Sequence, residues 1–172
     1  MSFRAFEQAI VSPALHQVAA HWNDARGERL MPSWRALNPA AIAAHLPIVW
    51  SYKYDREKDE FTSRIAGEKI VAIIGKNVRG VPMAEIFSKE EFPIFFARCK
   101  RVVSEPALCR GHGLVFKQLD RYGLGERIIL PLSSDGVRSD GLLGATEYRP
   151  FAGTPSPGVG SVKDVEEWYS CE

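Results

Sequence analysis

A short segment between two glycines has residues that could bind phosphate. It reads Gly75-Lys-Asn-Val-Arg-Gly80. A phosphate loop requires a lysine and then a serine or threonine directly after its last glycine, because the lysine reaches the phosphates and the hydroxyl holds magnesium. Val81 and Pro82 occupy those positions instead. We therefore interpret the two glycines as a helix stop and a turn, not as a nucleotide site.

Two histidines lie in sequence contexts where their side chains could bind a haem iron. His112 lies between Gly111 and Gly113 in a strand-like segment, and His45 ends a short predicted helix. The flanking glycines would let a flat ring approach His112, which makes it the preferred proximal ligand of a haem sensor. A single histidine is more commonly an ordinary core or surface residue. Haem binding is therefore an alternative, and the sequence requires no cofactor.

Acid–base catalysis would need a carboxylate or histidine that a partner holds in a cleft. The acids of Asp55–Glu60 fall in a charged link that we expect to be solvated, and Asp120 and Glu147 are isolated. No serine–histidine–aspartate set or paired acids stand out. We predict no catalytic residues and no enzyme, although a small-molecule enzyme on a related α+β scaffold is an alternative because fold does not fix function.

The three cysteines, Cys99, Cys109 and Cys171, lack the spacing of a metal site. We expect them to be reduced thiols. The formal net charge of the 172-residue chain is +1, which gives no electrostatic basis for nucleic-acid binding. Apolar stretches such as Ile70–Ile74 are too short to span a bilayer, and the N-terminus lacks a secretory apolar core. We expect a cytoplasmic protein without a membrane or nucleic-acid partner.

Five strand-like segments would position any site. Leu114–Leu119, Arg127–Leu132 and Leu142–Tyr148 are joined by glycine-bearing links and predict a three-strand antiparallel meander. Ile48–Tyr54 and Phe61–Ala66 predict two further strands upstream, with helices between the two groups. This order predicts an α+β fold with one small sheet and helices on one face, an architecture used more for sensing than for catalysis.

Three regions follow from this pattern. Residues 1–27 form an N-terminal helical extension, residues 28–149 form the sheet domain, and residues 150–172 form a linker-like tail rich in proline and glycine. The end of the tail is either a short amphipathic helix or a frayed end. Its apolar residues at helical spacing are Val162, Val165 and Tyr169.

The N-terminal extension carries an apolar stripe. Ser12 and Pro13 suit the cap and first turn of its second helix. Leu15, Val18 and Trp22 then recur at helical spacing. This helix could pack on its own sheet or on a copy of itself. Because it lies outside the expected sheet core, we predict that these three residues form the interface of a homodimer.

The chain resembles the PAS superfamily, specifically the small single-domain PAS-like proteins of alphaproteobacteria. Three patches carry the resemblance over roughly residues 28–148. They are Met31–Pro39 with His45–Pro47, then Arg64–Gly67 through Gly75 to Gly80, and then Leu130–Gly136 with Leu143 and Gly144. The resemblance implies a five-stranded antiparallel sheet cupped by helices, with any ligand between them. It also implies sensory or regulatory work through a signalling protein partner rather than catalysis.

Apolar residues would line the interior between sheet and helices in such a fold. They serve equally well as a plain packed core or as the wall of a cavity for a small apolar ligand, because burial of each is worth about 1.5–3 kcal/mol without any ligand. Both readings stay open. The cavity candidates are Phe61, Ile65, Ile70, Ile74, Phe87, Phe95, Phe96, Phe116, Ile129 and Leu143.

Overall fold

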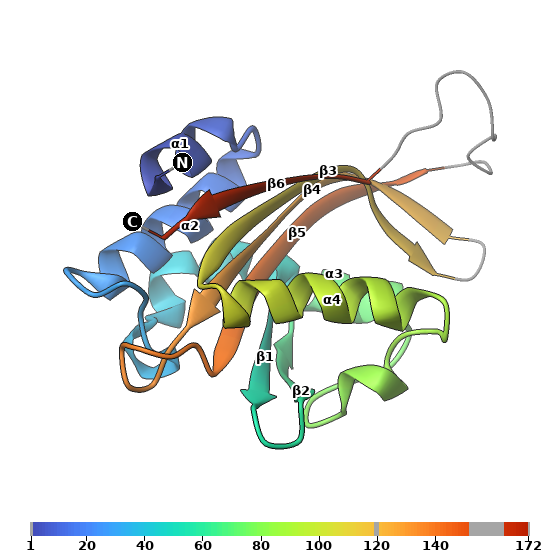
Figure 1. Cartoon of the computed structure of the whole chain (residues 1–172). Coiled ribbons are helices and arrows are strands. Elements are labelled where there is room, and N and C mark those ends of the chain that lie inside the picture. The colour runs from blue at the N-terminus through green and yellow to red at the C-terminus, as the bar shows by residue number, and fades with distance from the viewer. Residues whose placement is uncertain (1, 119–120, 152–163, 172) are drawn as a thin grey trace.

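The computed structural model describes residues 2–118, 121–151 and 164–171. Its strands form one antiparallel sheet in the order β2-β1-β5-β4-β3-β6 (Figure 1). The strands are β1 (Val49–Asp55), β2 (Glu60–Ala66), β3 (Ala107–Gln118), β4 (Arg121–Leu132), β5 (Gly141–Phe151) and β6 (Asp164–Ser170).

Helices precede the sheet and separate its two groups of strands. The α-helices are α1 (Phe3–Ala9), α2 (Pro13–Arg26), α3 (Glu68–Ile74) and α4 (Glu91–Ser104), and the 3-10 helices are η1 (Trp34–Ala36), η2 (Pro39–Ile48) and η3 (Met83–Glu85). Local signals set several ends. Ser12 caps α2 by accepting a bond from the Leu15 amide at 3.1 Å. Gly75, at φ 81°, ends α3 in the left-handed conformation that glycine adopts without strain.

The upstream hairpin and the downstream meander join edge to edge, as the sequence predicts. Residues 49–53 of β1 pair with residues 141–145 of β5, and β5, β4 and β3 follow one another as antiparallel neighbours. Pro131 continues β4 opposite Leu142 without a register shift. The α+β class and the PAS-like arrangement are confirmed.

A sixth strand extends the predicted five-stranded sheet. β6 pairs with β3 from Asp164 opposite Gly113 to Ser170 opposite Ala107. The expectation of a helix or a frayed end was therefore wrong for residues 164–170, where side chains alternate with the period of a strand. Val162 lies outside the described residues. β5 also runs to Phe151, two residues past the predicted domain boundary.

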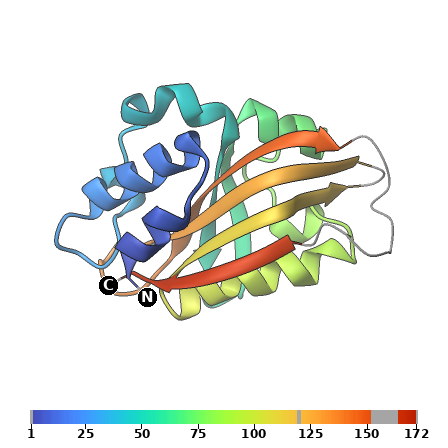
Figure 2. The ribbon, with the colours of Figure 1, turned by 90° about the horizontal axis from the view of Figure 1, so that it is seen from above.

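Helices cover both faces of the sheet (Figures 1 and 2). On one face, α3, η3 and α4 pack over the core that includes Tyr52, Ile129 and Leu142. On the other face, α1, α2 and η2 pack over the core that includes Leu108 and Ile128. Figure 2 shows that α1 and α2 cover only one end of that second face. The sheet is thus a wall between two separate apolar cores.

The stripe on α2 is part of the intramolecular core. Leu15, Val18 and Trp22 are fully buried within a single chain, and the Trp22 indole donates to the Pro131 carbonyl at 2.8 Å. They therefore have no exposed surface to offer a second copy, and their assignment to a dimer interface does not fit the structure. The reason is that this helix covers the second, apolar face of the sheet. The sequence pattern alone does not show which surface the helix packs on.

Candidate functional site

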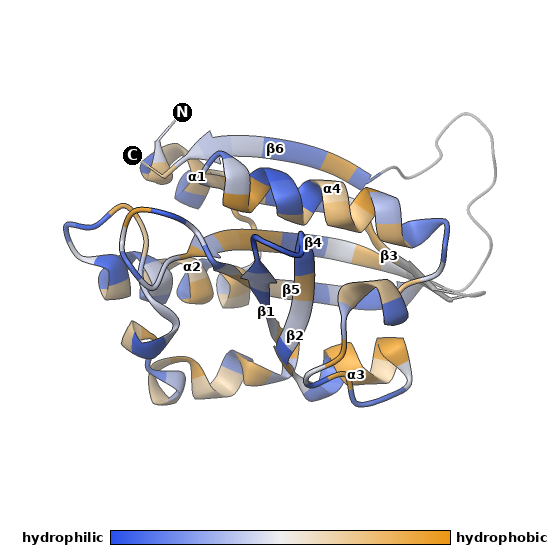
Figure 3. Ribbon diagram, turned by 60° about the horizontal axis from the view of Figure 1, so that its bottom comes forward, coloured by the Kyte–Doolittle hydropathy of each residue, from blue (hydrophilic) through white to orange (hydrophobic). Residues whose placement is uncertain are grey.

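A cavity of about 440 Å³ lies between the sheet and the helices α3 and α4. This volume is within the range of small-molecule sites. One wall is apolar, and α3, which supplies much of it, is among the most hydrophobic helices (Figure 3). The apolar and aromatic residues that line the cavity are Trp50, Tyr52, Ile65, Ala66, Ile70, Ile73, Ile74, Val78, Phe87, Ile94, Phe95, Leu114, Val115 and Phe116.

The structure separates the ten predicted cavity residues into three groups. Those that line the cavity are Ile65, Ile70, Ile74, Phe87, Phe95 and Phe116. Phe61, Phe96 and Ile129 pack in the core on the same side of the sheet but do not line the cavity. Leu143 lies in the core on the opposite face. Leu142 and Leu143 are adjacent and equally apolar, and the strand register, which places Leu142 on the cavity side, is not readable from the pair alone.

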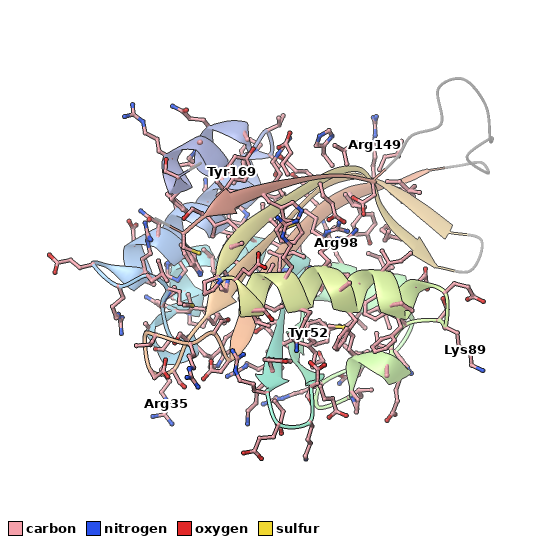
Figure 4. All side chains as sticks on the ribbon, viewed as in Figure 1. Arg35, Tyr52, Lys89, Arg98, Arg149 and Tyr169 are labelled. Atoms are coloured by element: carbon pink, nitrogen blue, oxygen red, sulfur yellow. The ribbon has the colours of Figure 1, made fainter. Side chains whose placement is uncertain are left out.

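The other end of the cavity is polar and is built from three elements distant in sequence. Arg98 of α4 donates to Asp164 at 2.6 Å and to Glu166 at 2.5 Å, both on β6. Arg127 of β4 donates to Asp164 at 3.0 Å and to the Val115 carbonyl at 2.9 Å. Figure 4 shows Arg98 in the space between α4 and the sheet. Two guanidinium groups are thus held by two carboxylates of one strand.

Burial and charge oppose each other at this polar end. Burial lowers the pKa of Arg98, but the carboxylates of Asp164 and Glu166 raise it, and the net effect lies above the ordinary value. The guanidinium therefore stays charged. Burial also raises the pKa of the Tyr52 phenol, so this hydroxyl stays protonated beside the apolar wall. The Trp50 indole donates to the Thr146 hydroxyl at 2.9 Å, which fixes the ring on the cavity side of the sheet.

Sequence reasoning missed this polar end for two separate reasons. A charged residue on an amphipathic helix is expected on the solvent side, whereas Arg98 is buried. The spacing held a usable signal, because Phe95 and Val102 lie three residues before and four after it, on the same helical stripe. Asp164 and Glu166 were missed because β6 itself was not predicted.

Neither histidine proposed as a haem ligand lines the cavity. The His112 side chain is 39% exposed, and its ring nitrogen lies 3.9 Å from Glu167 on the opposite face. His45 bonds to Gln17 at 2.6 Å. The strand register turns His112 away from the interior, since its neighbour Gly111 is the residue that faces Arg127. The haem assignment therefore has no support in the geometry of the cavity.

Two of the cysteines lie on the cavity side of the sheet. Cys99 of α4 and Cys109 of β3 are buried in the core between that helix and the sheet, and burial raises the pKa of both thiols above the ordinary value. They are therefore protonated, weak nucleophiles. Their role in the structure is that of small core residues.

A second polar network lies across the sheet from the cavity and anchors the N-terminal helices. Glu126 of β4 accepts from the backbone amides of Val11 at 3.1 Å and Ser12 at 2.7 Å. Arg110 of β3 bridges Glu126, at 2.5 Å, and Glu167 of β6, at 2.7 Å. Glu126 and Arg110 are both more than nine-tenths buried, so this pair is an internal clamp on the junction between α1 and α2.

Comparison with known proteins assigns the family. The chain matches the PAS_5 family model, described as a PAS domain, over residues 10–147. That range runs from the junction before α2 to β5 and covers well over half of the chain, whereas β6 lies beyond it. No curated protein and no solved structure matched. In the part of the chain that the structure describes, no helix is both long and apolar enough to cross a bilayer. The six-stranded sheet, its helices and this match together show that the chain belongs to the PAS domain family.

Proposed function

We propose that this PAS domain is a regulatory module that binds a small, largely apolar molecule in its cavity and signals occupancy to a partner protein. The observation that carries the proposal is the cavity of about 440 Å³, which has an apolar wall and a polar end. An apolar wall supplies affinity, and a few placed polar groups supply orientation. Such a site suits reversible binding.

Strand β6 supplies a physical route from the cavity to the N-terminal helices. Glu166 lines the cavity, and its neighbour Glu167 is held by Arg110 on the other face. Tyr169, two residues further on, packs its ring against Phe6 of α1, with centroids 5.5 Å apart. Figure 4 shows Arg98 and Tyr169 on opposite sides of the sheet. A displacement of β6 by a bound molecule is therefore felt directly by α1.

The readout is a shift between two packings of the N-terminal helices on the sheet. A ligand can shift such an equilibrium only through different contacts with the two states. Here the difference arises at Asp164 and Glu166, because the ion pairs of β6 form part of the cavity lining. The partner protein contacts the exposed side of α1 and α2, where Val11 at their junction is 79% exposed.

The binding step is tested with N-phenyl-1-naphthylamine, a neutral apolar probe that fluoresces more strongly when buried. We expect saturable binding of one probe per chain. Ile74→Trp, which fills the cavity from the end of α3, should weaken binding at least tenfold. The matched control is Val137→Trp, because Val137 is 72% exposed and does not line the cavity.

Two results would contradict the proposal. One is the absence of saturable binding to the unmodified chain. The other is equal probe affinity in Ile74→Trp and Val137→Trp, which would place the probe elsewhere. Native mass spectrometry of the protein isolated from its own host then identifies the molecule bound in the cell.

A further inference from the structure

The sign of the charge that the cavity presents follows from which charged groups remain accessible. Two buried arginines at the end of an apolar cavity suggest, at first sight, a site for a carboxylate or phosphate. The exposures indicate the opposite. The side chains of Arg98 and Arg127 are 7% and 4% exposed, whereas those of Asp164 and Glu166 are 24% and 30% exposed. The carboxylates are therefore the outer layer of this cluster, and the guanidinium groups lie beneath them.

The hydrogen bonds lead to the same conclusion. Asp164 and Glu166 both accept hydrogen bonds from Arg98, and Asp164 also accepts one from Arg127. The Nε atom of Arg127 has no hydrogen-bond partner among the described residues, but it is buried and therefore inaccessible to solvent. Of the two Glu166 oxygens, only Oε1 takes part in the contacts among those residues. The other Glu166 oxygen, Oε2, is an acceptor.

Among the residues that the structure describes, the set of charged lining residues has a negative balance. It consists of two arginines, Arg98 and Arg127, and three carboxylates, Glu91, Asp164 and Glu166, which leaves a charge of −1 at neutral pH. A ligand carboxylate would add a like charge beside Asp164 and Glu166 in a partly desolvated site, which is unfavourable. Trp50 and Phe95 also line the cavity, and aromatic rings attract cations to their faces.

We propose that the cavity selects an apolar, aromatic-sized molecule with a protonated amine and discriminates against one with a carboxylate or phosphate. The amine head lies at Glu166 and Asp164, and the apolar body lies along Ile70, Ile74 and Phe95. This inference rests on the proposed function, because it specifies the chemistry of the same cavity.

Three naphthalenes of nearly equal size test the inference on the unmodified protein. They are 2-naphthylmethylamine, 2-ethylnaphthalene and 2-naphthoate, which carry an ammonium, no charge and a carboxylate. We expect the amine to bind about tenfold more tightly than the carboxylate, with the neutral compound between them. Calorimetric titration at low salt gives the three dissociation constants, and added salt should reduce the difference.

A pair of variants assigns the effect to its residue. Glu166→Gln keeps the shape of the side chain and should reduce the preference for the amine over the carboxylate by severalfold. Glu90→Gln removes the same charge from an exposed position next to the cavity-lining Glu91 and should leave the preference unchanged. Thermal unfolding of both variants confirms that they fold, and the comparison of three probes on the unmodified protein does not depend on either.

The outcomes distinguish failure of the amine inference from failure of the proposed function. Equal affinity for all three probes, or tightest binding of the carboxylate, overturns the amine inference while leaving a binding cavity in place. Binding of none of the probes, together with no binding of N-phenyl-1-naphthylamine, overturns the proposed function and with it this inference. Loss of the preference in Glu90→Gln as well would show a general surface-charge effect and also overturns it.

Discussion

Glu126 is the residue whose removal should most weaken the attachment of the N-terminal helices. Its carboxylate binds two backbone amides at the α1–α2 junction, at Val11 and Ser12, and forms an ion pair with Arg110. Glu126→Gln keeps the size of the side chain but removes its charge. It also places an amide donor among groups that are themselves donors.

The magnitude follows from burial. Removing one partner of a buried ion pair costs about 3–5 kcal/mol. Arg110 keeps its second carboxylate, Glu167, so we expect the lower end, about 3 kcal/mol, out of a typical total stability of about 5–15 kcal/mol. With a urea m-value of about 2 kcal/mol/M, the unfolding midpoint should fall by roughly 1.5 M.

Urea unfolding followed by circular dichroism measures this change. Glu57→Gln is the matched control, since Glu57 is exposed in the β1–β2 link, and it should change stability by less than about 0.5 kcal/mol. Limited proteolysis should also cut near residue 11 faster in Glu126→Gln. A loss below about 1 kcal/mol, or one equal to that of Glu57→Gln, would refute the internal clamp.

Two other substitutions probe the cavity wall and the pH dependence. A Cβ at Gly144 would lie 2.2–2.4 Å from ring atoms of Trp50. Gly144→Ala should therefore destabilise the fold by about 1–3 kcal/mol, measured by thermal unfolding, and weaken the binding of N-phenyl-1-naphthylamine, measured by titration. An unchanged affinity would contradict the placement of Trp50. The Arg110 guanidinium holds the pKa of Glu167 below its ordinary 4.5, so Glu167 stabilises the fold above that pH and this contribution is lost as the pH falls through the lowered pKa. Glu167→Gln should therefore reduce the slope of unfolding free energy against pH below 4.5, and an unaltered slope would show that the ion pair is absent in solution.

The sequence predicts the shape of this fold better than it predicts the contents of its cavity. Hairpin and meander were readable because apolar runs of strand length are separated by glycine-bearing links, as with residues 127–132 and 142–148. The apolar wall was partly readable for the same reason. Leu143 was misplaced because its neighbour Leu142 is the same residue type, and only pairing with β1 decides which of them faces the cavity.

The polar end could not be read because it depends on contacts between distant segments. Asp164 and Arg98 are 66 residues apart and meet only when β6 adds to the edge of β3. The stripe of Leu15, Val18 and Trp22 was correctly identified as buried surface, but the pattern does not say which surface covers it. The chain's own sheet covers it. The predicted homodimer therefore does not rest on this stripe, and light scattering tests it separately.

Hydrogen–deuterium exchange, measured with and without N-phenyl-1-naphthylamine, tests most directly whether cavity occupancy reaches the N-terminal helices through β6. We predict changed exchange in β6 (residues 164–170) and in α1 and α2 (residues 3–26), on the far side of the sheet from the probe. The α1 and α2 response should be reduced in Glu167→Gln and in Tyr169→Ala, which removes the ring that packs against Phe6. Changes confined to α3, α4 and the strands that line the cavity would contradict the account.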